Sequence, residues 1–333
     1  VGTDVKSIEG GFSDPLHGIL QGVGARERGD GLHLGGGIIA GQNLGFILNE
    51  LTRNAALVEN FDDLAIPFRA VATDLETGQQ VVLADGNLSE AIRASMSIPG
   101  VYAPVKRDGR LLIDGGVANN LPVSVARDMG ADVVIAVDIT DPLLEADDLQ
   151  EAFSVVGQLT TLMTRINTDE QLDRLQEGDV LIRPDLEGRS SSDFYDAPIL
   201  FELGATSARA HASELRHLGV DKTRWQQFRD RIDVSAFSPG KIVRIVVEQD
   251  SKLAGEFLRS RIRQKPGETL DVDALEEDLK RIYGLGYYET VSYSLRPAEE
   301  GTVLVLQVQV RKRLEPGAAK PRTRRGIRTG PCP

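Results

Sequence analysis

The stretch 109–130, GRLLIDGGVANNLPVSVARDMG, contains the strongest candidate for chemistry in this sequence. It runs from an apolar strand through Asp114, Gly115 and Gly116 into a polar turn and a helix. A carboxylate at the carboxyl end of a strand in an open α/β sheet faces the crevice where ligands bind. Two glycines allow positive φ and close backbone approach. Asp114 is therefore a candidate general base, while spacing alone favours an aspartate that only accepts backbone hydrogen bonds in a turn.

Other chemistry-bearing residues have weaker contexts. Ser95 and Ser97 precede a helix stop, but the Gly-x-Ser-x-Gly elbow of hydrolase nucleophiles occurs nowhere in the chain. GGGIIAG at 35–41 matches a dinucleotide or oxyanion loop only loosely, because no convincing strand precedes it. Asp74 and Asp138 each end a strand, where a turn role is the simpler interpretation. The four histidines lack metal-ligand spacing, so we expect neither a metal nor a cofactor.

The charge is distributed unevenly along the chain. The formal net charge is −12, which argues against a nucleic-acid partner. Residues 311–333 nevertheless carry eight Lys or Arg and one Glu, without hydrophobic periodicity. Residues 313–333 are therefore interpreted as a basic disordered tail, and a basic arm for anionic lipid or nucleic acid is the alternative. The single cysteine, Cys332, excludes an internal disulfide framework.

The elements that must position Asp114 follow an α/β pattern. Strand, helix and strand alternate around it, which predicts a parallel layer. The run 131–140 is continuously apolar, which is typical of a strand buried on both faces. Strands are expected at 66–75, 79–84, 110–116, 131–140 and 180–183, and helices at 41–58, 87–100, 121–130, 149–177 and 198–218.

The pattern changes near Ser238–Gly240, where a second, smaller module begins. Alternating apolar residues and helical periodicity predict the order β-α-α-β-β over about 70 residues. We therefore expect a first domain at 1–238 and a small α+β domain at 240–312. The elements of the second are expected at 241–249, 253–262, 271–286, 288–297 and 302–310.

Residues 66–140 resemble patatin-like phospholipases. The resemblance rests on RASMSIPG at 93–100 and on the turn that begins with Asp114-Gly115-Gly116 and continues into NNLPV. It implies a mostly parallel sheet flanked by helices and a lipid acyl hydrolase with a Ser-Asp dyad. Asp114 would be the base of that dyad, in an Asp-Gly-Gly motif. The nucleophile serine and its Gly-x-Ser-x-Gly context are absent, so the resemblance implies an inactive chain.

The second module resembles a POTRA domain, the periplasmic module that precedes outer-membrane barrels. The segments that carry the resemblance are KIVRIVVEQ at 241–249 and DVDALEEDLKRIYGLGYYETVSYSL at 271–295. Patatin, POTRA and barrel together form the layout of bacterial lipases of the type V secretion class. A fragment without the nucleophile region and without the barrel would account for Val1, for the absent serine and for the basic tail.

The sequence therefore predicts a patatin-like hydrolase of phospholipids or other lipid esters, either located at the bacterial outer membrane or periplasm or secreted. Its expected partners are a lipid substrate, a membrane surface and an outer-membrane barrel or partner strand. The alternative is a non-catalytic module that acts through the POTRA-like domain by adding a partner strand to its sheet.

Overall fold

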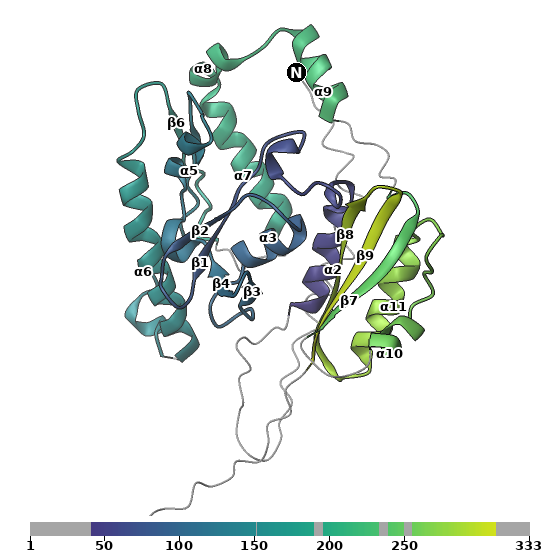
Figure 1. The fold of residues 1–333 in the computed structure, drawn as a ribbon. Helices are drawn as coiled ribbons and strands as arrows, with labels where there is room; N and C mark the ends of the chain where they lie inside the picture. Colours follow the sequence, from purple (N-terminus) through teal and green to yellow (C-terminus); the bar gives the residue numbers. More distant parts are fainter. Residues whose placement is uncertain (1–40, 151, 190–195, 233–238, 250–254, 311–333) are drawn as a thin grey trace, which may run out of the picture.

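The structure is a computed structural model that describes residues 41–150, 152–189, 196–232, 239–249 and 255–310 (Figure 1). The basic tail and most of GGGIIAG lie outside these residues. Two groups of strands and helices lie on either side of α2 (Gln42–Leu51), which contacts α3 (Leu88–Ser95) in one group and β8 (Tyr288–Ala298) in the other. None of the described helices is both long and apolar enough to cross a bilayer.

The first group contains a four-stranded antiparallel sheet in the order β2-β1-β4-β3. Its strands are β1 (Ala70–Asp74), β2 (Gln80–Leu83), β3 (Val105–Arg107) and β4 (Arg110–Asp114). Two hairpins build it. The β3–β4 hairpin turns through Asp108 and Gly109, at φ 51° and 78°, and Asp-Gly is a favoured pair for such two-residue turns. Strand β3 was not expected from the sequence.

The expectation of a mostly parallel sheet is corrected for the described residues. The described parallel pair in this group is β5 (Ile135–Val137) with β6 (Val180–Ile182). Strand β4 lies between β1 and β3 instead of pairing with β5, because the short Asp-Gly turn commits it to a hairpin, and hairpins are antiparallel. The run 131–140 forms a strand of three residues, and Ile135 and Val137 remain half exposed, at 49% and 50%.

The helices form where the periodicity predicts them, with shorter ends. The expected helix at 198–218 breaks at His211, and the helices at Gly116–Asn119 and Lys222–Ile232 were not expected. The remaining helices of this group are α4 (Gly116–Asn119), α5 (Val123–Asp128), α6 (Ala152–Leu172), α7 (Ala197–Ala210), α8 (Ala212–Leu215) and α9 (Lys222–Ile232).

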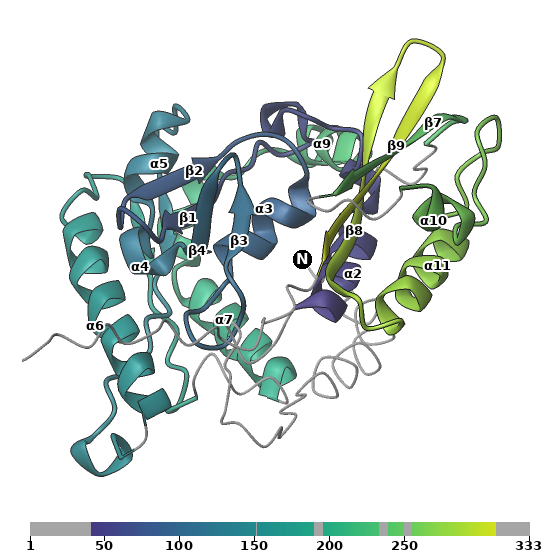
Figure 2. The ribbon, with the colours of Figure 1, turned by 60° about the horizontal axis from the view of Figure 1, so that its bottom comes forward.

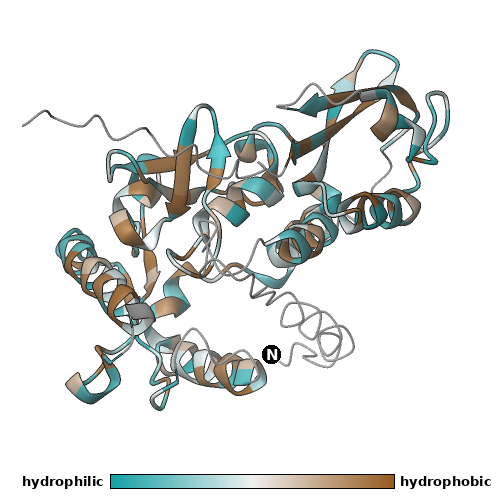
Figure 3. Ribbon diagram, turned by 90° about the horizontal axis from the view of Figure 1, so that it is seen from below, coloured by the Kyte–Doolittle hydropathy of each residue, from teal (hydrophilic) through white to brown (hydrophobic). Residues whose placement is uncertain are grey.

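Helix α3 packs on the antiparallel sheet and forms a small core with it. Phe61, Ala72 and Leu112 lie at the centre of this core, together with Ala91 and Ala94 of α3. Asn87 caps α3 by accepting a hydrogen bond from the N–H of Glu90 over 3.0 Å. Hydrophobic residues concentrate on the strands, whereas the helices show hydrophobic and hydrophilic bands (Figure 3). This banding is that of amphipathic helices, although α7 has no buried residue.

The second group confirms the predicted β-α-α-β-β order. Its sheet has the order β7-β9-β8, with β7 parallel to β9 and β8 antiparallel to it. Both helices lie on the same side of the sheet (Figure 2). Besides β8, its elements are β7 (Ile242–Gln249), α10 (Gly255–Ser260), α11 (Val272–Gly284) and β9 (Gly301–Val310).

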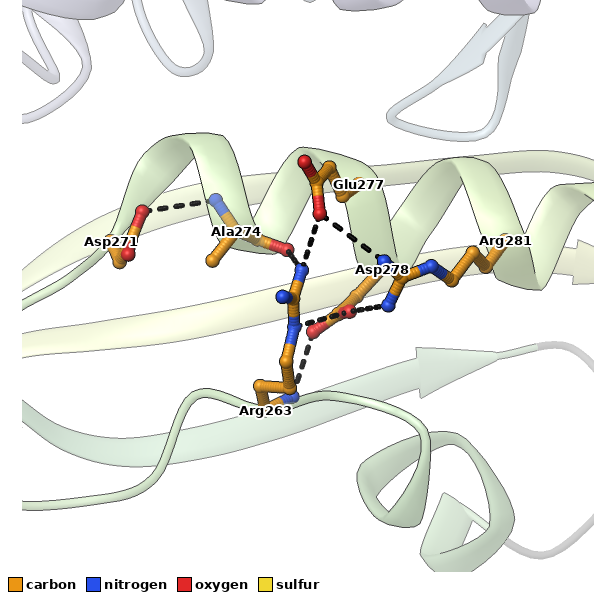
Figure 4. Close-up of polar contacts among 6 residues, drawn as sticks. All are labelled: Arg263, Asp271, Ala274, Glu277, Asp278 and Arg281. Atoms are coloured by element: carbon orange, nitrogen blue, oxygen red, sulfur yellow. Dashed lines mark hydrogen bonds and ion pairs between the residues drawn. The ribbon is translucent and has the colours of Figure 1, made fainter.

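A charged network ties the loop after α10 to α11 (Figure 4). The carboxylate of Asp278, 1% exposed, accepts hydrogen bonds from the main-chain N–H and the Nε of Arg263 at 2.7 and 2.9 Å. Arg281 contacts the same carboxylate at 3.2 Å. The hydrogen bond from Arg263 is the main reason why the pKa of Glu277 lies below its usual range. Asp271 begins α11 by accepting the N–H of Ala274 at 2.9 Å.

Helix α2 contributes to the core of the second group. Phe46 is buried among residues of α10, α11 and the sheet, and Lys280 of α11 lies over its ring at 5.5 Å. Leu44 and Leu48, on another face of α2, pack with Tyr102 in the first group. One helix therefore supplies apolar side chains to both groups.

Candidate active site

Asp114 is positioned by the main chain at the end of β4. Its N–H donates to the carbonyl of Ser97 at 3.0 Å, and its carbonyl accepts the hydroxyl of Thr73 at 2.8 Å. Ser97 and Thr73 are almost completely buried. The carboxyl-bearing residue is thus held on one side by the turn after α3 and on the other by the neighbouring strand β1.

One of the two carboxyl oxygens of Asp114 accepts a hydrogen bond. The N–H of Gly116 donates to Oδ1 at 2.8 Å. Within the described part of the chain, no ion pair or hydrogen bond reaches Oδ2. Burial raises the pKa of Asp114 above its ordinary value, and the Gly116 hydrogen bond only partly opposes this rise. The site thus presents a half-buried carboxyl with a raised proton affinity and a free oxygen.

The two glycines after Asp114 serve close approach. A Cβ on Gly115 would lie 2.0 Å from the carbonyl oxygen of Val71, and one on Gly116 would lie 3.0 Å from Oδ1 of Asp114. Neither glycine has a positive φ, so of the two uses that glycine allows at this turn, the structure shows the close approach. The turn continues directly into the short helix α4, which requires ordinary helical dihedrals, and the lack of side chains gives the room that the packing needs.

A network of amides connects the turn to α6. The N–H of Asn120 donates to Oδ1 of Asn167 at 2.7 Å, and Nδ2 of Asn167 donates to the carbonyl of Gly116 at 2.8 Å. Asn119 donates to Gln80 at 2.6 Å instead of capping the following helix, for which no side-chain cap is present. Asn167 lies 51 residues from Gly116. Sequence reasoning missed it, because an asparagine in the middle of a helix carries no local signal of a distant partner.

The two serines near the site do not have the geometry of nucleophiles. The hydroxyl of Ser97 is buried between the guanidinium and the carbonyl of Arg93, at 2.6 and 2.7 Å. The carbonyl of Ser95 accepts the N–H of Gly115 at 3.1 Å. Both residues therefore hold the Asp114 turn through their main chains, in the structural role expected for them.

The other two candidate carboxylates, Asp74 and Asp138, make turn and ion-pair contacts of their own. Asp74 accepts the N–H of Glu76 at 2.9 Å, which is the expected turn contact. Asp138 accepts hydrogen bonds from Thr140 and Arg183; burial raises its pKa, but these hydrogen bonds outweigh that effect and lower it. Within the described ranges, no three His, Cys, Asp or Glu residues gather at a possible metal site.

Comparisons with known proteins identify both segments. Residues 12–127 match the family model of patatin-like phospholipases, and residues 240–313 match the POTRA family, described as surface antigen variable number repeat. Patatin-like phospholipase domain-containing protein 7 of Mus musculus is 49% identical over 80 residues, which cover 23% of this chain and 6% of that protein. An uncharacterized NTE family protein of Mycobacterium tuberculosis is 50% identical over 78 residues, 23% of this chain and 22% of that protein.

Among solved structures, POTRA1-2 of the periplasmic domain of Omp85 from Anabaena is similar at 28% identity, with a TM-score of 0.20. The match covers 22% of this chain and 49% of that chain. The segments matched in the mouse and mycobacterial proteins span less than a quarter of the length of either protein. The chain thus holds one segment that matches the patatin-like phospholipase model and one that matches the POTRA model, as its motifs predicted.

Proposed function

We propose that the patatin-like segment belongs to a lipid acyl hydrolase of the phospholipase A or esterase type, in which Asp114 is the base of a Ser-Asp dyad. The observation that carries the proposal is the free Oδ2 of a rigidly held carboxyl. Hydrogen bonds at the N–H, the carbonyl and Oδ1 leave this oxygen available. A general base needs such a fixed position and a proton affinity above that of a solvated carboxylate. Burial raises the pKa of Asp114 and so supplies the higher proton affinity.

The chemistry proceeds through an acyl-enzyme. As the serine Oγ attacks the ester carbonyl, its proton passes to Oδ2 of Asp114, and the leaving alcohol then takes that proton as the carbon–oxygen bond breaks. A water molecule next gives a proton to Asp114 while it attacks the acyl-serine, and Asp114 passes that proton to the departing serine Oγ, which releases the fatty acid and restores the serine. Asp114 ends in its initial state, and no atom changes oxidation state in these steps.

The nucleophile is not among these 333 residues, since no Gly-x-Ser-x-Gly occurs in them. We therefore propose that this chain, taken alone, does not form an acyl-enzyme. The domain limits at 1–238 and 240–312 and the tail at 313–333 remain part of the proposal. A location at the bacterial outer membrane or periplasm follows from the POTRA match together with a lipid substrate.

The test compares this chain with a longer product of the same gene that includes in-frame sequence before Val1. We expect no fluorophosphonate labelling of the 333-residue chain, and labelling of one serine in the longer product. Asp114→Asn in the longer product should abolish hydrolysis of p-nitrophenyl butyrate while leaving the protein folded. A serine adduct on the 333-residue chain, or full activity of the Asp114→Asn variant, contradicts the proposal.

A second function, partner binding by the POTRA domain, is favoured by its open sheet edge. Strand β7 is paired on one side only, and a cavity of about 490 Å³ lies beside its residues Val243 to Ile245. An unpaired strand edge is a template for an added strand. The test is hydrogen exchange, which should slow in the POTRA sheet when an extended peptide binds.

A further inference from the structure

The two edges of the POTRA sheet differ in how accessible they are. The sheet has the order β7-β9-β8, so β7 and β8 are its two edges. Figure 1 shows α2 beside β8, with β7 on the opposite edge of the sheet. An extended segment can pair with an edge only where the outward main-chain groups of that strand are free. The contacts of α2 therefore decide which edge a partner can use.

The edge at β8 is already occupied by a side chain of α2. Nε2 of Gln42 donates to the carbonyl of Val291 at 2.5 Å, and the N–H of Val291 donates to Oε1 of Gln42 at 2.9 Å. The amide thus makes the two hydrogen bonds that a neighbouring strand would make. Gln42 and Val291 are both buried, and Phe46, one turn further along α2, is buried in the POTRA core. An added strand could pair with β8 at Val291 only if α2 left.

The edge at β7 is open and lies beside a groove. The cavity there is lined by apolar groups of Val243, Ile245, Ile262 and Pro266, of which only Ile262 is buried. The loop at 264–269 covers only the start of the strand, through hydrogen bonds between Ile242 and residues Gly267 and Glu268. Beyond that point the cavity lies beside Val243 to Ile245, and Arg259 and Ser260 of α10, a helix that contacts β7, also line it.

The rim of the groove is positively charged. Arg244, Arg259 and Lys265 line it and are exposed. Within the described residues, none of the three side chains forms an ion pair or a hydrogen bond. Two nearby arginines are engaged elsewhere: Arg261 lies over the ring of Phe257 at 4.9 Å, and Arg263 binds Asp278. Three cations that have no ion pair among the described residues lie around an apolar floor. They favour a ligand with alternating acidic and apolar groups, since these face the cations and the floor in turn.

We infer that the POTRA domain takes its partner at β7, and that this partner is an extended acidic peptide segment. The inference rests on the partner binding proposed above and is independent of the hydrolase proposal. It assigns the two edges different roles: β8 is closed by the chain's own α2, and β7 selects a partner by charge.

Binding of two labelled peptides to the full chain tests the inference. The probes are short fluorescein-labelled peptides of alternating Val and Glu, or of alternating Val and Lys, followed by fluorescence anisotropy. The Val-Glu peptide should bind, with an affinity that falls as salt rises, and the Val-Lys peptide should not. The triple variant Arg244→Glu, Arg259→Glu and Lys265→Glu should lose roughly tenfold or more in affinity.

A second triple variant is the matched control. Lys222→Glu, Arg224→Glu and Arg229→Glu change three exposed cations of α9 by the same total charge. This control should bind the Val-Glu peptide like the unaltered chain. An equal loss in both triple variants would show a general effect of net charge and overturn the inference.

Hydrogen exchange locates the bound peptide. Protection should rise over β7 and stay unchanged over β8, and Gln42→Ala should not raise the affinity. Protection confined to β8, with tighter binding by Gln42→Ala, overturns the choice of edge but leaves partner binding standing. No binding of either peptide at millimolar concentration overturns both. A last measurement uses vesicles of phosphatidylglycerol. If the first triple variant loses vesicle binding but keeps peptide binding, the groove is a lipid site and the inference fails.

Discussion

The main-chain N–H of Asp114 donates a hydrogen bond to the carbonyl of Ser97 over 3.0 Å, and so fastens the end of β4 to the turn after α3. The hydroxyl of Ser97 is in turn enclosed by Arg93, whose guanidinium lies over the ring of Tyr102 at 4.9 Å. The position of the candidate base therefore depends on a buried polar contact in a different element. Both Arg93 and Ser97 belong to the RASMSIPG motif, so this contact gives Ser97 a structural role in the motif.

Replacing Ser97 with alanine should destabilise the protein by about 1–3 kcal/mol. The substitution removes a buried acceptor of the Arg93 guanidinium, and an unsatisfied buried donor costs about that much. Urea unfolding measures the change. Ser95→Ala is the control and should stay within about 0.5 kcal/mol, because the hydroxyl of Ser95 makes no hydrogen bond among the described residues. Equal effects of the two substitutions would contradict the role given to the Ser97 hydroxyl.

Gly115→Ala should destabilise the first group by about 2 kcal/mol or more. The new Cβ would lie 2.0 Å from the backbone oxygen of Val71, so β1 or the Asp114 turn must move. Gly157→Ala is the matched substitution in α6, where the Cβ meets nothing within 4 Å. That change should stabilise by up to about 1 kcal/mol, the helix-propensity difference. Thermal unfolding of both variants checks the prediction, which a tolerated Gly115→Ala would refute.

The free energy of unfolding should depend on pH through Glu276. Burial is the main cause that raises the pKa of Glu276 above its ordinary value, and Lys280 opposes it. Its Oε1 has no hydrogen-bond partner. Because the pKa of Glu276 is raised in the folded state, its contribution to the free energy of unfolding is fully present below the unfolded-state pKa. That contribution is lost as the pH rises through the folded-state pKa. Glu276→Gln should therefore be more stable than the unaltered chain at pH 7, and this advantage should vanish near pH 4.

Denaturant unfolding across pH 4 to 8 measures this difference. Glu289→Gln is a suitable control, because its side chain is exposed on β8 and should leave the pH dependence unchanged. A Glu276→Gln advantage that grows toward low pH would have the wrong sign for a raised pKa.

Asp278→Ala should cost about 1–3 kcal/mol in the POTRA domain. The carboxylate is 1% exposed and accepts two hydrogen bonds from Arg263, although the arginine side chain is half exposed, which reduces the penalty of leaving it unpaired. Glu277→Ala removes a neighbouring acid whose ion pairs lie in solvent, and it should cost at most about 1 kcal/mol. Chemical unfolding that ranks the two in the opposite order would contradict this reading of Figure 4.

Local patterns predicted the POTRA domain almost completely. Its strands alternate, α11 begins at a capping aspartate, and each element follows its neighbour closely along the chain. The patatin-like sheet was harder, because strand direction there depends on a turn of two residues, Asp108 and Gly109, next to a strand of only three. A short strand has too few residues to show an alternating pattern.

Some residues of the candidate site could be predicted from the sequence, and others could not. Asp114 and its two glycines could be found from their types and order, since a strand, a carboxylate and a turn are adjacent in sequence. The groups that hold them could not. Thr73 and Asn167 lie 41 and 51 residues from the main-chain groups that they bind, and nothing local marks either as a partner. The role of Gln42 was hidden for the same reason.

The pairing of Gln42 with Val291 spans 249 residues of the chain. Contacts of such sequence separation form late, because the entropy of closing the loop must be met before they add stability. We therefore expect the core around Phe46 to be completed in two kinetic stages. Strands β7 to β9 and their helices would associate first, and α2 would join them only after the first group has folded around its other face. The slowest folding phase would then report the assembly of the two halves.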